Sequence, residues 1–81
     1  MECNIMAVRI GARREMSPRV QQVLADYGCN IRVRLGLHDL GDECTDEGLL
    51  VLQLTGEQSS LRELEQSLNS LGSVKAQMIS V

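Results

Sequence analysis

The stretch GLLVLQLTGEQSSLRELEQSLNSLG, residues 48–72, decides the fold. Its apolar beginning, residues 49–54, lies between two glycines, which predicts a short strand buried on both faces in the middle of a sheet. Ser59 or Ser60 then offers an N-cap hydroxyl to a helix that ends at Gly72. The helix carries a single leucine stripe, formed by Leu61, Leu64, Leu68 and Leu71. This spacing predicts a helix that packs on the sheet.

Three more strands and a second helix are predicted around this stretch. Alternating apolar residues predict strands over residues 3–10, 31–37 and 74–79. Ser17, which is followed by a proline, is the predicted N-cap of a helix over residues 18–27. In the second strand the alternation directs Ile31, Val33, Leu35 and Leu37 to the core, and Arg32, Arg34 and Gly36 away from it.

The predicted element order is β-α-β-β-α-β. With right-handed crossovers it gives an α+β ferredoxin-like sandwich, in which two helices cover one face of an antiparallel sheet. The expected strand order is fourth, first, third, second. No linker or low-complexity tract interrupts the pattern, so residues 1–81 are predicted to form a single domain.

The other face of the sheet is predicted to be apolar. Its residues would be Ile5, Ala7, Arg9, Leu49, Val51 and Ile79. An apolar face of this kind marks an interface. The chain has 81 residues, one tyrosine and no phenylalanine or tryptophan, so its own core is small. We therefore expect a homodimer or homotetramer built through this face.

Charge and cysteine content restrict the partners and the compartment. A net charge of −3 argues against direct binding of nucleic acid, which needs a basic surface. The three cysteines form no CxxC pair, which favours reduced thiols in the cytoplasm. No apolar run is long enough to span a membrane, and the N-terminus lacks the layout of a secretion signal.

Two loops contain candidate binding residues. The loop of residues 38–47 is rich in carboxylates, and its His38 and Cys44 are the candidate metal ligands, although a solvated hairpin loop is the other interpretation. The loop of residues 11–17 leads into the first helix, where free amides and arginines can hold an anion. Its candidate effector-binding residues are Gly11, Arg13, Arg14 and Ser17, and a plain exposed turn is the alternative.

A third candidate functional set is the outward-facing row of Arg32, Arg34 and His38. The other interpretation is that these charges prevent an edge strand from pairing with the edge of another sheet. No catalytic set of serine, histidine and acid is visible, and no phosphate-binding glycine-rich loop occurs. A small enzyme of the acylphosphatase type, with Arg13 or Arg14 as an anion clamp, is an open alternative. The chain is otherwise predicted not to be an enzyme and to need no cofactor.

The pattern resembles the ACT-like regulators of iron-only hydrogenase systems, which are similar to the C-terminal domain of nickel-responsive repressors. The resemblance covers nearly the whole chain and rests on residues 5–10, on IRVRLG at 31–36, on residues 49–56 and on the leucine-striped helix. It implies a dimeric or tetrameric regulatory domain without its own DNA-binding segment. It also implies small effectors bound at subunit interfaces, near the loop of residues 11–17.

The expected function is therefore a small oligomeric, effector-sensing regulatory module of an iron-only hydrogenase system. The alternative is a metal-binding or metal-trafficking protein that uses the loop of residues 38–47.

Overall fold

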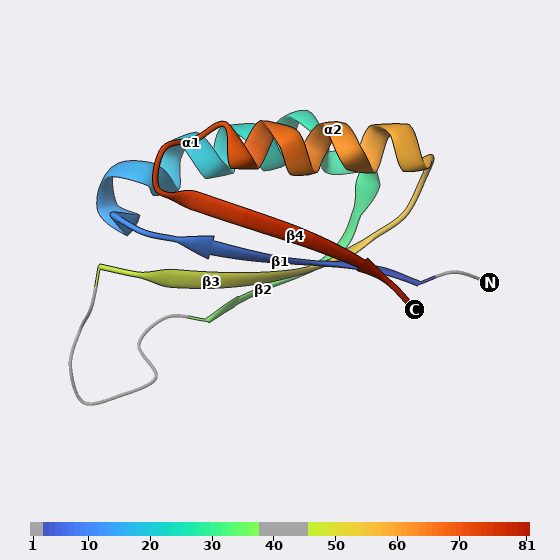
Figure 1. Cartoon of the computed structure of the whole chain (residues 1–81), viewed down its shortest axis with the longest axis horizontal. Coiled ribbons are helices and arrows are strands. Elements are labelled where there is room, and N and C mark those ends of the chain that lie inside the picture. The colour runs from blue at the N-terminus through green and yellow to red at the C-terminus, as the bar shows by residue number, and fades with distance from the viewer. Residues whose placement is uncertain (1–2, 38–45) are drawn as a thin grey trace.

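The computed structural model describes residues 3–37 and 46–81, and it has the predicted βαββαβ order (Figure 1). The elements are β1 (Asn4–Ile10), α1 (Arg13–Asp26), a 3₁₀ turn η1 (Gly28–Asn30), β2 (Ile31–Leu37), β3 (Gly48–Leu54), α2 (Gln58–Asn69) and β4 (Val74–Ser80). Only η1 has no counterpart in the sequence prediction.

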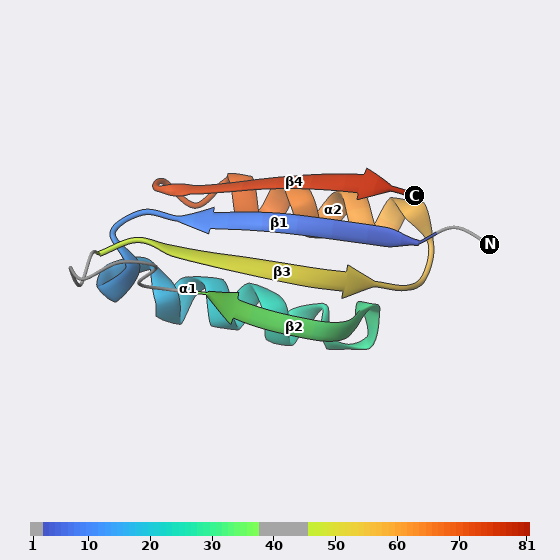
Figure 2. The same cartoon turned by 90° about the horizontal axis from the view of Figure 1, so that it is seen from below.

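One antiparallel sheet carries both helices on the same face. Its strand order is β2-β3-β1-β4, which is the predicted order. Seen from below, the four strands lie in front and the two helices lie behind them (Figure 2). The ferredoxin-like α+β fold is confirmed.

The core lies between the sheet and the helices. Along β1, β3 and β4 the even-numbered residues face the helices, as the alternation predicts. The buried apolar side chains are Met6, Val8, Ile10, Met16, Val20, Leu24, Leu52, Leu54, Leu61, Leu64, Leu68, Val74 and Ala76. Three of the four predicted stripe leucines of α2 are fully buried, and Leu71 packs on the margin.

Helix α1 begins five residues before its predicted start. Ala12, not Ser17, is the N-cap residue, with φ of 47°, and Pro18 lies inside the helix. The early start has a long-range cause, because Asp46 satisfies two amides of the first turn. Its carbonyl oxygen accepts from the Arg13 amide at 2.9 Å, and its Oδ1 accepts from the Arg14 amide at 3.0 Å.

Helix α2 also begins earlier than predicted. Glu57 is its N-cap, so neither Ser59 nor Ser60 has this role. The helix ends at Asn69, and a turn closed by a bond from the Leu71 amide to the Leu68 carbonyl follows before Gly72. These shifts of two or three residues leave the buried leucine stripe unchanged.

The largest correction concerns β2, whose side chains face the opposite way from the prediction. Ile31 pairs with Leu54, but Val33 pairs with Gln53, so Arg32 is an extra residue at a β-bulge. Beyond the bulge Leu35 pairs with Val51, which lies on the face away from the helices. Leu37 shares the register of Val33 and Leu35, whereas Arg34 and Gly36 now share the register of the core-facing residues. One inserted residue exchanges the two faces of a strand.

Side-chain contacts agree with this register. The Arg34 Nη2 atom donates to Gln21 Oε1 of α1 at 2.6 Å, which is possible only on the helix side of the sheet. Val33 and Leu35 are each 53% exposed, because no helix covers the face on which they lie. Of Ile31, Val33 and Leu35, which were predicted to face the core, only Ile31 packs against the core cluster.

The outer edge of β4 is covered by α2. The Ala76 amide donates to Asn69 Oδ1 at 2.8 Å, and Asn69 Nδ2 donates back to the Ala76 carbonyl at 3.0 Å. One turn earlier on α2, Glu65 Oε2 accepts from the Met78 amide at 2.7 Å. These amides point away from β1, so side chains of α2 take the place of a neighbouring strand.

Candidate functional site

The most extensive candidate site is the sheet face without helices, called here the bare face (Figure 2). Its apolar side chains come from all four strands and are Ile5, Ala7, Val33, Leu35, Leu49, Val51 and Ile79. Val33, Leu35 and Ile79 are each more than half exposed. The central strands contribute the exposed Ala7 and the half-buried Ile5, Leu49 and Val51, so apolar register partners follow one another across the sheet.

Polar side chains border this apolar surface at both ends and along the β4 edge, but not at the β2 edge. Arg9 and Lys75 are register partners at one end of the bare face, and Gln53 lies at the other end. Gln77 lies along the β4 edge. An apolar centre with a polar rim is the arrangement found in protein–protein interfaces.

All six residues that the sequence predicted for an interface lie together on the bare face. Ile5 is the register partner of Ile79, Ala7 that of Val51, and Arg9 that of Leu49, which also confirms the predicted alternation of β1 and β3. However, Leu49 and Val51 are only half-buried, so β3 is central but not buried on both faces in the single chain. The role of this face as an interface stays a prediction.

The sequence prediction missed Val33 and Leu35, which extend the bare face to the β2 edge. An even alternation contains no signal for an inserted residue, and the one glycine of this strand, Gly36, is regularly paired with Leu50. The bulge lies four residues earlier, at Arg32. The predicted row of Arg32 and Arg34 is accordingly divided between the two faces of the sheet.

The predicted effector loop lies at the start of α1. Gly11 donates its amide to the Ser73 carbonyl at 2.7 Å, and Arg13 and Arg14 form the first turn of the helix. Ser17 lies one turn further along. An anion of the chain itself, the Asp46 carboxylate, already accepts from the Arg14 amide. Effector binding by these residues stays a prediction. At the N-terminus of α1, where we expected an anion from a ligand, the Asp46 carboxylate of the same chain accepts a hydrogen bond.

The predicted metal ligands His38 and Cys44 lie outside the described residues. Within residues 3–37 and 46–81, no group of three or more histidine, cysteine, aspartate or glutamate side chains could hold a metal ion. In the same part of the chain, no helix is long and apolar enough to cross a membrane.

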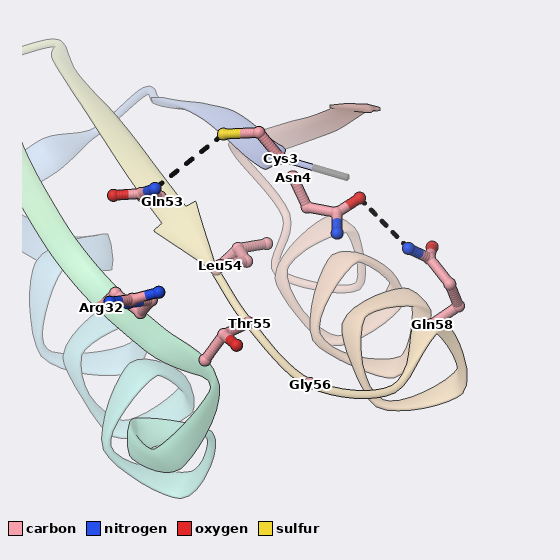
Figure 3. A pocket seen from close by; sticks show the side chains of 8 residues that line it. All are labelled: Cys3, Asn4, Arg32, Gln53, Leu54, Thr55, Gly56 and Gln58. Atoms are coloured by element: carbon pink, nitrogen blue, oxygen red, sulfur yellow. Dashed lines mark hydrogen bonds between the residues drawn. The ribbon is translucent and has the colours of Figure 1, made fainter. Parts of the chain in front are cut away.

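A pocket that the sequence prediction missed lies at the end of the sheet where β1 begins and β3 ends (Figure 3). Its volume is about 410 Å³, and its polar walls include Cys3, Asn4, Arg32, Gln53 and Gln58. These residues come from four separate segments, so no local motif announces the pocket.

Comparisons with known proteins support the fold and give no information about the function. No protein-family model matches the chain, and no curated protein matches it. The chain is similar to the solved structure of an uncharacterized protein, TM1266, from Thermotoga maritima, with a TM-score of 0.84. The match covers 100% of this chain and 99% of that one at 16% sequence identity. At this identity the likeness shows a shared fold alone.

Proposed function

We propose that the chain is a homo-oligomeric regulatory module, in which the bare faces of two copies pack together and a small effector adjusts the assembly. The observation that supports this proposal is the bare face itself, an apolar surface of seven side chains with a polar rim.

The size of the bare face favours an interface. Four seven-residue strands cover roughly 19 by 23 Å, or roughly 440 Å², at the usual strand spacing and rise. The apolar part of this area is comparable to the largest apolar patch of a typical monomer, and such patches often have a function. A chain of 81 residues also gains proportionally more from such burial, because its own core is small.

Symmetry favours a second copy as the occupant. A two-fold axis through the bare face brings the same apolar centre against itself, so both partners lose the same exposed surface. The rim charges, Arg9 and Lys75, lie at one end of the face and away from its centre, so their repulsion need not fall on the axis.

The regulatory role is the part of the proposal that the family resemblance supports. The sequence resembles small ACT-like regulators of iron-only hydrogenase systems, and this resemblance implies a dimeric or tetrameric regulatory domain without its own DNA-binding segment. The net charge of −3 supports the same conclusion, because this chain would need a partner to contact DNA.

Native mass spectrometry of the untagged chain and two variants tests the proposal. The unmodified chain should be a dimer or tetramer at micromolar concentration. Leu35→Glu places a charge on the exposed part of the bare face, so it should give a monomer with an unchanged circular dichroism spectrum. Gln66→Glu adds the same charge to the exposed surface of α2 and should leave the oligomer intact. An unmodified chain that is monomeric under these conditions would refute the proposal.

A further inference from the structure

The pocket at the end of the sheet has walls that are fixed by the fold. The Thr55 amide donates to the Asn30 carbonyl at 2.8 Å, and Asn30 Nδ2 donates to the Thr55 carbonyl at 3.0 Å. Gly56 follows with φ of +113°, a conformation that favours glycine, and a Cβ atom there would lie 2.5 Å from Asn30 Nδ2. The wall formed by Thr55 and Gly56 is therefore held in place before any ligand arrives.

The β-bulge supplies the pocket with its positive charge. Arg32 is the extra residue, and its side chain lies in the wall opposite the start of β1 (Figure 3). Arg34, two residues later, is bonded to α1 on the other side of the sheet. Bulges often re-aim a side chain at a functional site. Without the inserted residue, β2 would present a different side chain here.

A buried amide adds a donor to the same pocket. Asn4 is only 6% exposed, and its Oδ1 accepts from Ser80 Oγ at 2.6 Å and from Gln58 Nε2 at 3.1 Å. Its Nδ2 donates to no group within residues 3–37 and 46–81. A donor in the wall of an open pocket is available to an acceptor on a bound molecule.

The rest of the lining is also suited to an acceptor. Gln53 lies beside Cys3, with its Nε2 3.9 Å from the sulfur, and α2 begins at Gln58, so the positive end of that helix lies at the pocket. Within the described part of the chain, no acidic side chain lines the pocket. Among the lining residues that the structure describes, an anion would meet donors and positive charge.

We infer that this pocket binds a small organic anion through its carboxylate or phosphate group, with Arg32 and Asn4 as the main contacts. The planar guanidinium matches either oxyanion in a two-bond geometry. A volume of about 410 Å³ suits a metabolite-sized ligand. The inference rests on the proposed regulatory function, because it names the class of effector and its site. Cys3 and Gln53 also belong to the end of the bare face, so a bound ligand would border the interface.

The test is a titration of the ¹⁵N-labelled, untagged full chain with succinate and with inorganic phosphate, and with chloride at matched ionic strength. We expect saturable shifts of the Thr55 and Gly56 amides with at least one probe and none with chloride. Saturation by succinate alone identifies a carboxylate ligand, and saturation by phosphate alone identifies a phosphate ligand. Shifts that chloride reproduces, or no saturation by either probe, would overturn the inference.

Two variants with the same change of charge on the same strand provide the control. Arg32→Gln should weaken binding roughly tenfold or more, as expected for a lost charge-assisted hydrogen bond. Arg34→Gln should bind as the unmodified chain does, because Arg34 lies on the helix side of the sheet. Equal weakening by both variants would mean a general charge effect and would contradict a specific site.

The rate of cysteine alkylation provides a second measurement of ligand binding on the same samples. Cys3 and Cys29 are free thiols, and Cys3 lines the pocket, whereas Cys29 is exposed in η1 and does not line it. A bound probe should slow alkylation of Cys3 by iodoacetamide and leave that of Cys29 unchanged. Oligomeric state is measured in parallel. A dimer that binds neither probe would refute the pocket inference and leave the proposed oligomer intact. A monomer that binds one probe would refute the proposed oligomer and leave the pocket inference intact.

Discussion

The two edge strands, β2 and β4, have similar alternating sequences but opposite surroundings. β4 keeps its alternation, buries Val74 and Ala76 under the helices, and has its outer amides bonded by Asn69 and Glu65 of α2. β2 contains a bulge, turns Val33 and Leu35 to the bare face, and has a hydrogen bond from Arg34 to Gln21 of α1.

Two features decide the environment of an edge strand. One is its register, which a single inserted residue can change, and the other is whether the helix above has side chains that reach the edge. α2 reaches β4 and closes that edge to another strand. At β2, the outward amides of Arg34 and Gly36 have no partner within the described residues, and apolar surface continues to the edge. In the proposed oligomer, a second copy would therefore contact the bare face and the β2 side of the molecule.

The largest expected difference comes from the same substitution on both edge strands. Val74→Ala removes two buried carbon atoms and should lower the free energy of unfolding by about 2 kcal/mol. Val33→Ala removes the same atoms from a half-exposed side chain and should cost about 0.5 kcal/mol or less in the monomer. Urea unfolding at low protein concentration measures both. Equal losses would show that the bulge is absent and that Val33 is a core residue.

A smaller effect is expected when the β4 edge is opened. Asn69→Ala removes both hydrogen bonds to Ala76 and should cost about 1–2 kcal/mol, because water can replace part of what is lost at this half-exposed position. The Ala76 amide should also exchange its hydrogen with solvent much faster. Gln66→Ala, at an exposed position of the same helix, is the matched control and should change neither quantity. Unchanged exchange at Ala76 in the Asn69 variant would mean that α2 does not close the edge.

The smallest effect is expected at the contact between β2 and α1. Arg34→Ala removes one exposed hydrogen bond to Gln21 and should cost about 0.5 kcal/mol or less. A double-mutant cycle with Gln21→Ala isolates this bond. A coupling of more than about 1.5 kcal/mol, which is the range of buried bonds, would show that α1 holds the β2 edge as firmly as α2 holds β4.

Features with a regular local period could be predicted from the sequence. The alternation of β1, β3 and β4 and the leucine stripe of α2 predicted the element order, the sheet order and the composition of the bare face outside β2. Each of these patterns reflects burial on one side of an element, which is recorded in neighbouring residues.

Features that depend on distant residues could not be predicted. The start of α1 depends on Asp46, which lies more than thirty positions after Arg13. The local sequence shows only Ser17 followed by a proline, which is the usual signal of an N-cap and a first helical residue. The bulge at Arg32 reflects how β2 pairs with β3, and a regular alternation gives no sign of it. The pocket combines four segments, and it exists only after the bulge has placed Arg32 in its wall.

In the proposed dimer, the bare face of one copy contacts the bare face of the other. The most direct measurement is an isotope-filtered nuclear Overhauser experiment on a mixture of ¹³C-methyl-labelled and unlabelled chains, which detects only contacts between copies. We expect intermolecular signals at the methyl groups of Leu35, Val51 and Ile79 and none at the core residue Leu64. Intermolecular signals confined to residues of α1 or α2, or their complete absence at millimolar concentration, would contradict the account.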